Sequence, residues 1–282
     1  MFKKKKSGCL TFICFLLIIG LTASLAINNT LTVENYTLYS NSIKSPIRVV
    51  VAADLHSTFH GKQQEKLVSL IEAQNADLLL MPGDMVDDNV PRDGAIAFLE
   101  AIQGKLPIYY SKGNHEYWSR DIEGIVELME DYGVTVLADS YAFITVKGNR
   151  LLIAGADDPA KERYQDENYD MNTAMGKAFG HFEEGAPYKM LLAHRPERFD
   201  EYAKYAFDLV VSGHAHGGQA RIPLLLNGLY APNQGFFPKL AGGQYEENGT
   251  TMIVSRGLSV FPHMPRIFNP PELVVIDILP AE

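Results

Sequence analysis

Five short apolar segments of this chain each end directly in a cluster of polar side chains. The first segment, residues 47–53, is rich in β-branched residues and leads into Asp54-Leu55-His56. The same order recurs after residues 78–81, 106–110, 190–193 and 207–211. Apolar residues at helical spacing separate the first three segments, which is the rhythm of βαβ units. The pattern predicts an α/β fold in which polar side chains gather at the carboxyl ends of the strands.

Two later regions of the chain depart from this alternation. Three closely spaced β-rich runs, at residues 134–138, 141–146 and 151–155, predict a meander inside the sheet. Residues 217–250 show no periodicity, and their scattered aromatic residues favour an ordered wall beside a site over a disordered loop. The β-rich runs at residues 251–255 and 273–279 are expected to close the sheet.

The composition bounds the size and the charge of the expected domain. The chain has 282 residues, 46% of them hydrophobic, which suffices for one large domain, expected over residues 46–282. The formal net charge of -9 argues against a nucleic-acid partner, because a phosphate backbone requires clustered Lys and Arg. A substrate that carries phosphate would therefore need bound cations to offset this negative field.

The first 27 residues have the pattern of a targeting segment. A basic run at residues 3–6 precedes an apolar run at residues 9–26. Small residues at Ser24 and Ala26 allow cleavage as a secretory signal, whereas the length of the run allows an uncleaved signal anchor in the membrane. In both cases the position of the lysines predicts an extracytoplasmic domain, either held by a single membrane span or secreted. Residues 28–45 are expected to form a linker and an entering strand.

The polar clusters supply a mixed set of metal-ligating side chains. His214 and His216 lie one residue apart on a glycine-rich turn, where imidazoles can approach an ion closely. Both cysteines of the chain, Cys9 and Cys14, lie in the targeting segment, so the domain has no thiolate ligand and no disulfide. Carboxylate, imidazole and amide oxygen suit Zn²⁺, Mn²⁺ or Fe. The set is too large for one four-coordinate ion and suits two divalent ions that share a carboxylate: Asp54, His56, Asp84, Asn114, His194, His214 and His216.

The order of these clusters resembles the five-block signature of the calcineurin-like metallophosphoesterase superfamily. The blocks are Asp54-x-His56, Gly83-Asp84, Gly113-Asn114-His115-Glu116, His194 and Gly213-His214-x-His216. The resemblance covers residues 31–280, and Gly217-Gly218-Gln219 with Gly228-Leu229-Tyr230 is similar to the bacterial membrane-anchored or exported branch. It implies a four-layer α/β/β/α sandwich. It also implies that Asp54, His56 and His216 hold one ion, that Asn114, His194 and His214 hold the other, and that Asp84 bridges them.

The resemblance implies hydrolysis of a phosphoester by in-line attack of a hydroxide that bridges the two ions. Two cations lower the pKa of a shared water and stabilise the developing negative charge, so no protein nucleophile is required. Because Asn114 is the ligand in its block, His115 is free to act as the general acid that protonates the leaving oxygen. The carboxylate that holds the tautomer of His115 is expected at Asp84 or Asp87.

Within this family the sequence favours a phosphodiesterase or pyrophosphatase over a Ser/Thr phosphoprotein phosphatase. The arginine that the latter would have after the second block is replaced by Asp87-Asp88-Asn89. The expected substrate is a cell-envelope or lipid-linked phosphoester, such as UDP-diacylglucosamine in relatives of this branch, and the expected state is a monomer. The alternative function is a non-catalytic metal-binding or cell-wall-binding scaffold. His115, which metal binding alone does not need, weighs against that alternative.

Residues outside the five blocks have more than one interpretation. Asp157 and Asp158 follow a predicted strand and either support the site or form a loop turn. Arg256 and Arg266 either contact a phosphate or form structural salt bridges. The aromatic stretch at residues 235–238 either borders an apolar substrate, faces a bilayer or packs in the core.

Overall fold

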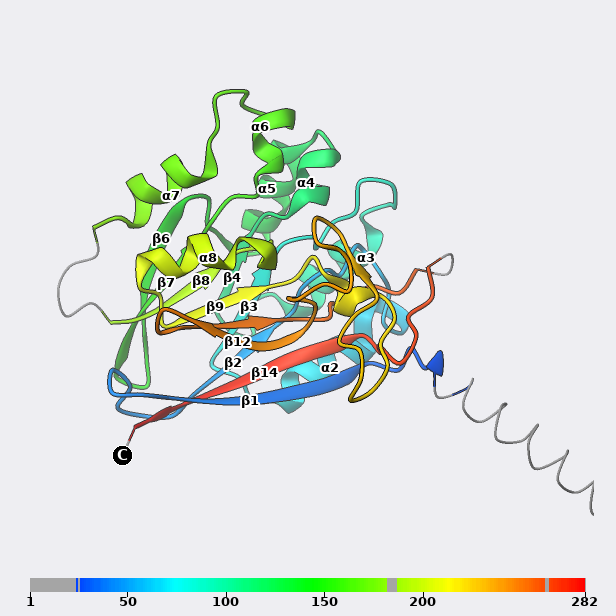
Figure 1. The fold of residues 1–282 in the computed structure, drawn as a ribbon, viewed down its shortest axis with the longest axis horizontal. Coiled ribbons are helices and arrows are strands. Elements are labelled where there is room, and N and C mark those ends of the chain that lie inside the picture. The colour runs from blue at the N-terminus through cyan, green and yellow to red at the C-terminus, as the bar shows by residue number, and fades with distance from the viewer. Residues whose placement is uncertain (1–23, 25, 182–186, 262–263, 282) are drawn as a thin grey trace, which may run out of the picture.

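The computed structural model describes residues 24, 26–181, 187–261 and 264–281 (Figure 1). The predicted targeting segment, residues 1–27, therefore lies almost entirely outside the described residues. Within the described ranges, none of the helices combines the length and the hydropathy that a membrane span requires.

Among the described residues, six strands form the first sheet: β1 (Thr32–Ser40), β2 (Ile47–Val51), β3 (Leu78–Pro82), β4 (Ile108–Ser111), β5 (Thr135–Val136) and β14 (Glu272–Pro280). Their order is β1-β14-β2-β3-β4-β5. The strands from β2 to β5 are successive parallel neighbours, while β14 lies antiparallel to β2 and parallel to β1. The segment expected as a linker and entering strand thus contributes β1, which pairs with β14 along its whole length.

The second sheet also has six strands in the part of the chain that the structure describes: β6 (Ser140–Val146), β7 (Asn149–Gly155), β8 (Tyr188–Leu192), β9 (Leu209–Ser212), β12 (Gly243–Glu247) and β13 (Thr250–Val254). Their order is β12-β13-β9-β8-β7-β6. The four central strands are parallel, and the outer strands β12 and β6 join them through antiparallel hairpins. Both sheets are therefore mixed.

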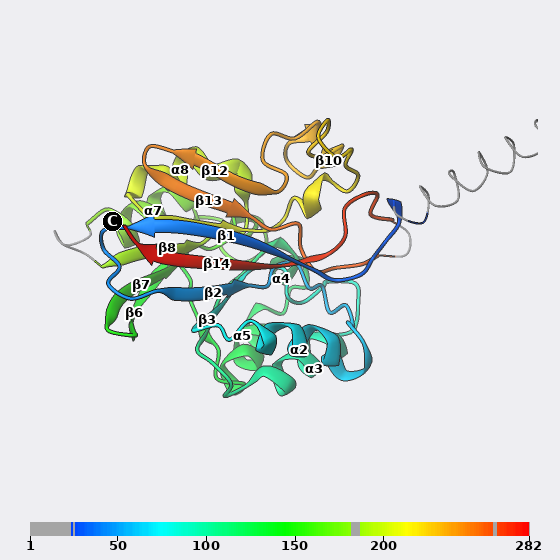
Figure 2. The ribbon, with the colours of Figure 1, turned by 90° about the horizontal axis from the view of Figure 1, so that it is seen from below.

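Helices cover the outer face of each sheet (Figure 2). The first sheet is covered by α2 (Glu65–Ala73), α3 (Asp93–Ile102) and α5 (Ile122–Asp131). The second is covered by α7 (Met171–Phe179) and α8 (Phe199–Tyr202). Shorter elements of the described chain are η1 (Lys62–Gln64), α4 (Asn114–Trp118), α6 (Ala160–Tyr164), η2 (Pro196–Arg198), η3 (Ala203–Tyr205), η4 (His216–Gly218), β10 (Tyr230–Ala231) and β11 (Gly235–Phe236).

Side chains of the central strands alternate between two apolar cores, because successive residues of a strand point to opposite faces. In β3, Leu78 and Leu80 pack between the two sheets, whereas Leu79 and Met81 pack under the helices. A third core lies between the second sheet and its own helices. The order of layers is helix, sheet, sheet, helix, so the expected α/β/β/α sandwich is confirmed.

The predicted meander and the predicted closing strands were wrong in their placement. The chain leaves the first sheet after β5 and turns at Asp139, which has a φ of +45°, so only β6 and β7 form a hairpin, and they do so in the second sheet. The last two β-rich runs also separate, because β13 belongs to the second sheet and β14 to the interior of the first. A continuous apolar run indicates a buried strand and carries no information on which of two stacked sheets receives it.

The stacking brings the carboxyl ends of the parallel strands of both sheets to the same end of the molecule. β3 contacts β8 and β9 of the facing sheet, and the strands β2, β3, β4, β8 and β9 all end there. This is the right-hand end in Figure 1, where the described chain also begins. Ligand sites of α/β proteins lie at such carboxyl ends.

Candidate metal centre

The structure brings the seven predicted metal ligands together at this common end. Each lies within five residues of the strand that precedes it. Six of the seven are at most 3% exposed, and His216 is half-buried. A set of carboxylates and imidazoles this deeply buried requires compensating partners, because an unpaired buried charge is costly.

The backbone at five of these seven residues has a positive φ, a conformation that residues other than glycine rarely adopt. Positive φ values occur at Asp54 (52°), His56 (46°), Asp84 (53°), His214 (64°) and His216 (46°). Each such residue costs on the order of 1–3 kcal/mol, and strain of this kind concentrates at functional sites. The strained backbone of these loops directs their side chains toward one place. The strain also lowers the local stability of the loops.

The aimed side chains form two adjacent clusters of potential ligands. One contains Asp54, His56 and His216, and the other contains Asp84, His194 and His214, with the ligand atoms of each cluster within 4.8 Å of one another. Asp84 Oδ2 lies 3.0 Å from His194 Nε2 and 3.6 Å from His56 Nε2, so it faces both clusters. A carboxylate in this position can be shared between two ions.

Three buried polar atoms of the site make no hydrogen bond to any described residue: Asp54 Oδ2, His56 Nε2 and Asn114 Oδ1. A buried polar atom without a partner costs about 1–3 kcal/mol, so three in one place would be a severe penalty. Divalent cations would satisfy all of these lone pairs at once. The mixture of oxygen and nitrogen donors suits Mn²⁺, Zn²⁺ or Fe.

Glycine is required where the backbone passes against the carboxylates. A Cβ atom on Gly213 would lie 2.5 Å from Asp54 Oδ2, and one on Gly113 would lie 2.3 Å from Asp84 Oδ1. No side chain fits at these distances. The backbone amides nearby also hold the carboxylates, since His214 N donates to Asp54 Oδ1 at 2.9 Å and His115 N donates to Asp84 Oδ1 at 2.9 Å.

Each predicted histidine ligand has one ring nitrogen engaged by the protein. His56 Nδ1 lies 2.9 Å from Asp87, His194 Nδ1 lies 2.9 Å from the carbonyl of Pro82, and His216 Nδ1 lies 3.2 Å from Ser259 Oγ. In His214 the ring nitrogen with a protein partner is Nε2 and not Nδ1, and it lies 2.8 Å from Asn233 Oδ1. The nitrogens left for an ion are thus Nε2 in the first three rings and Nδ1 in His214. Partners of this kind fix the tautomer and orientation of a metal-binding imidazole.

Burial and neighbouring charges set the protonation states of these groups. Burial lowers the pKa of the His214 and His216 rings well below the usual value, so both are neutral at pH 7, the form that ligates metal. Burial has the same tendency at His194, but the Asp84 and Asp54 carboxylates outweigh it and raise the pKa of His194 to about 10. Burial alone would raise the pKa of Asp84, yet the charge of His194 holds it well below its usual range.

The carboxylate that orients His115 is Asp88, and the expectation of Asp84 or Asp87 in this role was wrong. His115 Nδ1 lies 2.6 Å from Asp88 Oδ1, and Asp87 Oδ2 is farther away at 3.5 Å. Asp87 instead binds His56. Neighbouring residues of this loop point in different directions, which the sequence does not reveal. His115 is partly exposed, and its Nε2 is the nitrogen left for a substrate.

Glu116 organises the site through the backbone, a role that sequence reasoning missed. Its fully buried carboxylate accepts hydrogen bonds from the backbone N–H groups of Asp84 (3.0 Å), Val86 (3.0 Å) and Gly113 (2.7 Å). These bonds tie the turn after β3 to the turn after β4. A buried carboxylate that accepts three backbone hydrogen bonds fixes the positions of those N–H groups.

Replacing Glu116 with Gln should therefore destabilise the turns that carry Asp84 and Asn114. The amide would place an N–H₂ group against a backbone N–H, and we expect a loss of about 2 kcal/mol in the free energy of unfolding. Urea denaturation of metal-free protein measures the loss, with Glu127→Gln on the exposed face of α5 as the matched control. An unchanged midpoint for the Glu116 variant would show that the three bonds do not stabilise the site.

Arg195, whose role sequence reasoning also missed, connects His214 to the loop at residues 217–250. The Arg195 guanidinium makes two bonds to Asp158, of 2.7 and 2.9 Å, and donates at 2.7 Å to Asn233 Oδ1, the atom that also contacts His214. Asp158 thus supports the site and is more than a loop turn. The part of the loop at residues 217–250 that carries Asn233 lies beside the predicted ligands, as an ordered wall would.

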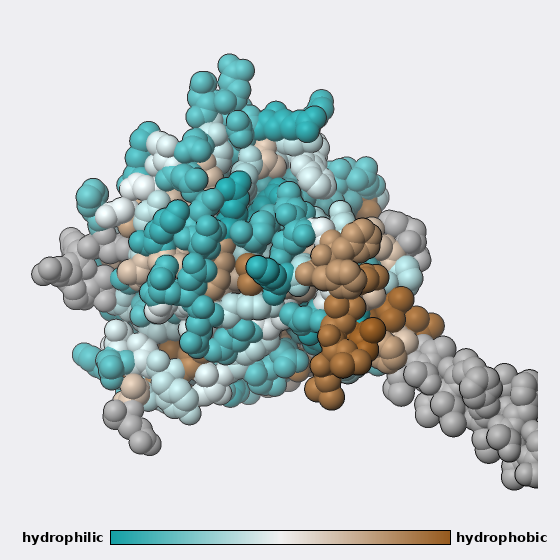
Figure 3. Space-filling view, in the orientation of Figure 1, coloured by the Kyte–Doolittle hydropathy of each residue, from teal (hydrophilic) through white to brown (hydrophobic). Residues whose placement is uncertain are grey.

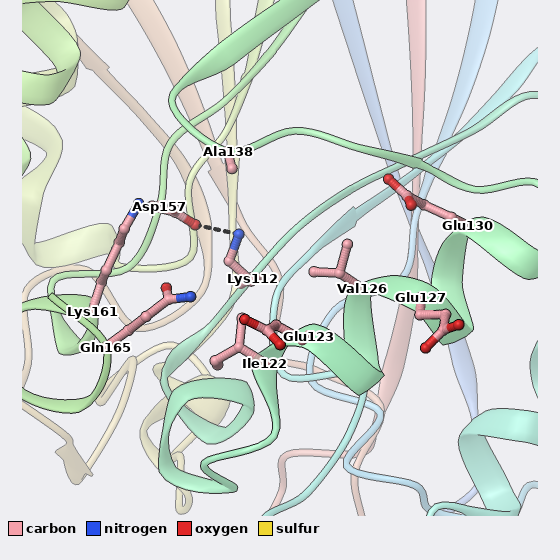
Figure 4. Close-up of a pocket in the computed structure, with 10 residues that line it drawn as sticks. All are labelled: Lys112, Ile122, Glu123, Val126, Glu127, Glu130, Ala138, Asp157, Lys161 and Gln165. Carbon is pink, nitrogen blue, oxygen red and sulfur yellow. Dashed lines mark hydrogen bonds and ion pairs between the residues drawn. The ribbon is translucent and has the colours of Figure 1, made fainter.

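The neighbouring Asp157 supports the site from the other side. Lys112, which precedes Gly113, forms a buried ion pair with Asp157 at 2.7 Å, and Lys161 pairs with the same carboxylate at 2.8 Å (Figure 4). These residues border a cavity of about 380 Å³ whose lining contains none of the predicted ligands. The cluster joins the end of β4 to the end of β7 and makes no part of the metal centre itself.

The two arginines near the C-terminus have structural partners. Arg256 binds the carboxylate of Glu272 and lies 3.5 Å from Glu34. Arg266 is buried and donates to the carbonyls of Ser259 and Arg256, at 2.8 and 2.7 Å. Arg256 therefore forms the structural salt bridge that was one of its two predicted roles, whereas Arg266 holds the loop through backbone carbonyls and forms no ion pair with a described residue.

Comparisons with known proteins place this site in a family. A family model described as calcineurin-like phosphoesterase matches residues 47–218, more than half of the chain. Uncharacterised metallophosphoesterases of Campylobacter jejuni and Aquifex aeolicus are both 28% identical, over 90% and 88% of this chain and 65% and 92% of their own lengths. A zebrafish transmembrane protein with a metallophosphoesterase domain is 31% identical over 61% of this chain.

The chain spans only 41% to 65% of the length of several curated relatives that it matches. Among solved structures, the NAD nucleotidase of Haemophilus influenzae has the same fold, with a TM-score of 0.51 and 20% identity over 76% of this chain and 46% of its own. The family model covers the strands that precede all five predicted blocks, and it includes His214 and His216 of the fifth block. This chain belongs to the calcineurin-like phosphoesterase family.

Proposed function

We propose that this protein is a phosphoesterase that depends on two divalent metal ions. The observation that carries the proposal is the position of Asp84 between two clusters of buried ligands, beside Asp54 Oδ2, His56 Nε2 and Asn114 Oδ1, which have no hydrogen-bond partner among the described residues. Membership of the calcineurin-like phosphoesterase family supports the same activity. A site built only for structural metal would not need His115 and its carboxylate partner beside the clusters.

The geometry supports the division of ligands between the two ions. Asp54, His56 and His216 would hold one ion, and His194 and His214 with Asn114 would hold the other. Asp84 would bridge the two. When bound, Mn, Zn or Fe ions supply Lewis acidity, which withdraws electrons from phosphoryl oxygens and lowers the pKa of water.

His115 is the residue of the chain that we assign to proton transfer. Hydrolysis places water across a P–O bond, and the oxygen that leaves must gain a proton. Asp88 holds His115 Nδ1, so Nε2 carries the transferable proton and faces outward from that bond. The backbone N–H of His115 is bound to Asp84, and this bond keeps the acid at a constant position relative to the ligands.

For the substrate we propose a phosphodiester or pyrophosphate of the cell envelope, including lipid-linked compounds. The sequence at residues 9–26 supports a position at the membrane, with residues 1–27 as signal or anchor, 28–45 as linker and first strand, and 46–282 as the extracytoplasmic phosphoesterase domain. A relative described as a transmembrane protein gives the same support for a membrane-anchored or exported branch. The monomeric state is part of this proposal.

A panel of three substrates tests the proposed reaction. Bis-p-nitrophenyl phosphate, p-nitrophenyl phosphate and a UDP-linked lipid are offered to metal-stripped protein after addition of Mn²⁺ or Zn²⁺. We expect metal-dependent release from the diester and the UDP-lipid, with slower turnover of the monoester. Fast monoester hydrolysis with negligible diester hydrolysis would refute the preference for diesters. Turnover of none of the three, with metal bound, would favour the non-catalytic scaffold.

A further inference from the structure

The loop after the metal centre exposes a group of large apolar side chains to solvent. Ile222 is 50% exposed, Leu224 105%, Leu225 84%, Phe236 70% and Phe237 66%. We call these five residues the apolar rim. Figure 3 shows hydrophobic surface gathered at the end of the molecule where the described chain begins, while the rest of that face is largely hydrophilic. Phe236 and Phe237 are therefore not core residues.

Backbone hydrogen bonds hold the rim in a defined conformation, so the exposure of its side chains is part of the fold. Residues 222 and 226 exchange backbone hydrogen bonds of 3.0 and 2.8 Å, which close a tight turn with Leu224 at its tip. β10 pairs with β11, and Phe237 N donates to Leu229 O at 2.8 Å. Exposure of leucine side chains to water on a fixed turn is unfavourable. Burial of these side chains in an apolar environment would remove that cost.

The rim borders the candidate metal centre. The segment that carries it begins directly after η4, and Leu229 N donates to Gly218 O at 2.9 Å. Asn233, between β10 and β11, makes the 2.8 Å contact with His214. Any surface that contacts and buries the Phe236 and Phe237 side chains would therefore also lie close to the predicted ligands.

The rim also lies next to the point at which the apolar N-terminal run ends. Arg221 N donates to Ile267 O at 2.9 Å, and Phe268 N donates to Ala26 O at 2.6 Å. These bonds connect the rim through residues 267–268 to Ala26, the last residue of the run at 9–26. Ile27 and Ile267 add exposed apolar surface at 58% and 39%. The apolar rim and Ala26 thus lie at the same end of the molecule.

We propose that the apolar rim inserts into the interfacial region of a lipid bilayer and holds the metal centre against the membrane surface. Side chains of this kind enter roughly 5–10 Å into the boundary between headgroups and acyl chains. A lipid-linked phosphoester would then reach the site from the membrane without leaving it. The proposal uses the membrane location given under the proposed function, and it does not use the proposed chemistry.

Depth-dependent fluorescence quenching tests the insertion in the full-length chain. Cys9 and Cys14 are the only cysteines, so a chain with both changed to Ser and with Leu224→Cys takes one environment-sensitive label. The matched control carries Tyr39→Cys, because Tyr39 is 67% exposed and lies near the end of β1 away from the metal centre. Both are reconstituted in phosphatidylethanolamine and phosphatidylglycerol vesicles that contain acyl-chain spin labels.

We expect the label at position 224 to be quenched at least about threefold more than the label at position 39, and to stay quenched in high salt, since apolar burial is not screened. Equal quenching at the two positions would overturn the proposal. Close approach of two labels at position 224 on different molecules would also overturn it, because the rim would then be an interface between copies of this chain.

A second measurement separates this proposal from the proposed reaction. Leu224→Glu with Leu225→Glu should lower turnover of a vesicle-embedded UDP-lipid about tenfold and leave soluble bis-p-nitrophenyl phosphate turnover unchanged. Tyr39→Glu is the control. Quenching at 224 without turnover of any substrate would support the rim and refute the phosphoesterase. Equal turnover of the vesicle-embedded lipid by the double variant and the control would count against the rim.

Discussion

Asp84→Asn is expected to remove both metal ions and to reduce phosphoesterase turnover by about 10³-fold or more. Asp84 Oδ2 faces both ligand clusters, so loss of its charge weakens both ion positions, and the new amide would place N–H donors where lone pairs are needed. The change also removes the negative charge that compensates His194. Metal analysis of the purified protein, together with diester turnover, measures the effect.

The matched control for this prediction is Asp93→Asn. Asp93 is an exposed aspartate at the start of α3, so its variant should keep full metal content and full turnover. If Asp84→Asn kept two ions per chain, Asp84 would not be the bridging ligand. Retention of one ion would assign Asp84 to a single position.

His115→Ala is expected to keep both ions and to lose about 10²- to 10⁴-fold in turnover of substrates with a poor leaving group. His115 stands beside the clusters with Asp88 on Nδ1, and the two clusters assigned to the ions, Asp54-His56-His216 and Asp84-His194-His214, do not include it. The loss should be smaller for p-nitrophenyl esters, because p-nitrophenolate leaves without being protonated. Turnover of alkyl and p-nitrophenyl diesters by the same variant measures this difference.

Two further variants make the assignment of His115 specific. Asp88→Asn should give an intermediate loss, because it leaves the ring in place and removes only the carboxylate that fixes its tautomer. His181→Ala, at an exposed histidine outside the site, should behave as wild type. Full loss of metal in His115→Ala would show that the residue is a ligand and would refute its role as general acid.

The α/β class was predictable from the residue pattern, whereas the order of the four layers was implied by the family resemblance. The run at residues 78–82 is apolar throughout because β3 packs between a sheet and helices, and Leu78 and Leu79 show the two faces. Because such a run is apolar on both faces, it does not indicate which of the two sheets the strand joins. A strand buried on both faces has no polar side to mark its neighbours, and so the placement of β13 and β14 could not be derived from their sequences. The edge strand β5 has only two residues, too few to show a pattern.

The ligand set was predictable because its chemistry is local. Asp54 with His56, and His214 with His216, each stand in one short segment after a strand, and the residue types alone indicate metal binding. Asp88, Glu116 and Asn233 gave no such signal. An aspartate in a loop, a glutamate in a helix and an asparagine between short strands are common, and their roles arise from contacts with residues 19 to 32 positions away.

The sequence by itself determined the α/β class and the seven side chains that the strands deliver, because strand periodicity and ligand chemistry are properties of short segments. Only the tertiary structure decided which carboxylate serves which histidine, and that the loop at residues 222–237 lies beside both the metal centre and Ala26. These relations depend on the stacking of two sheets and on backbone turns with positive φ, through which residues far apart in the chain come into contact.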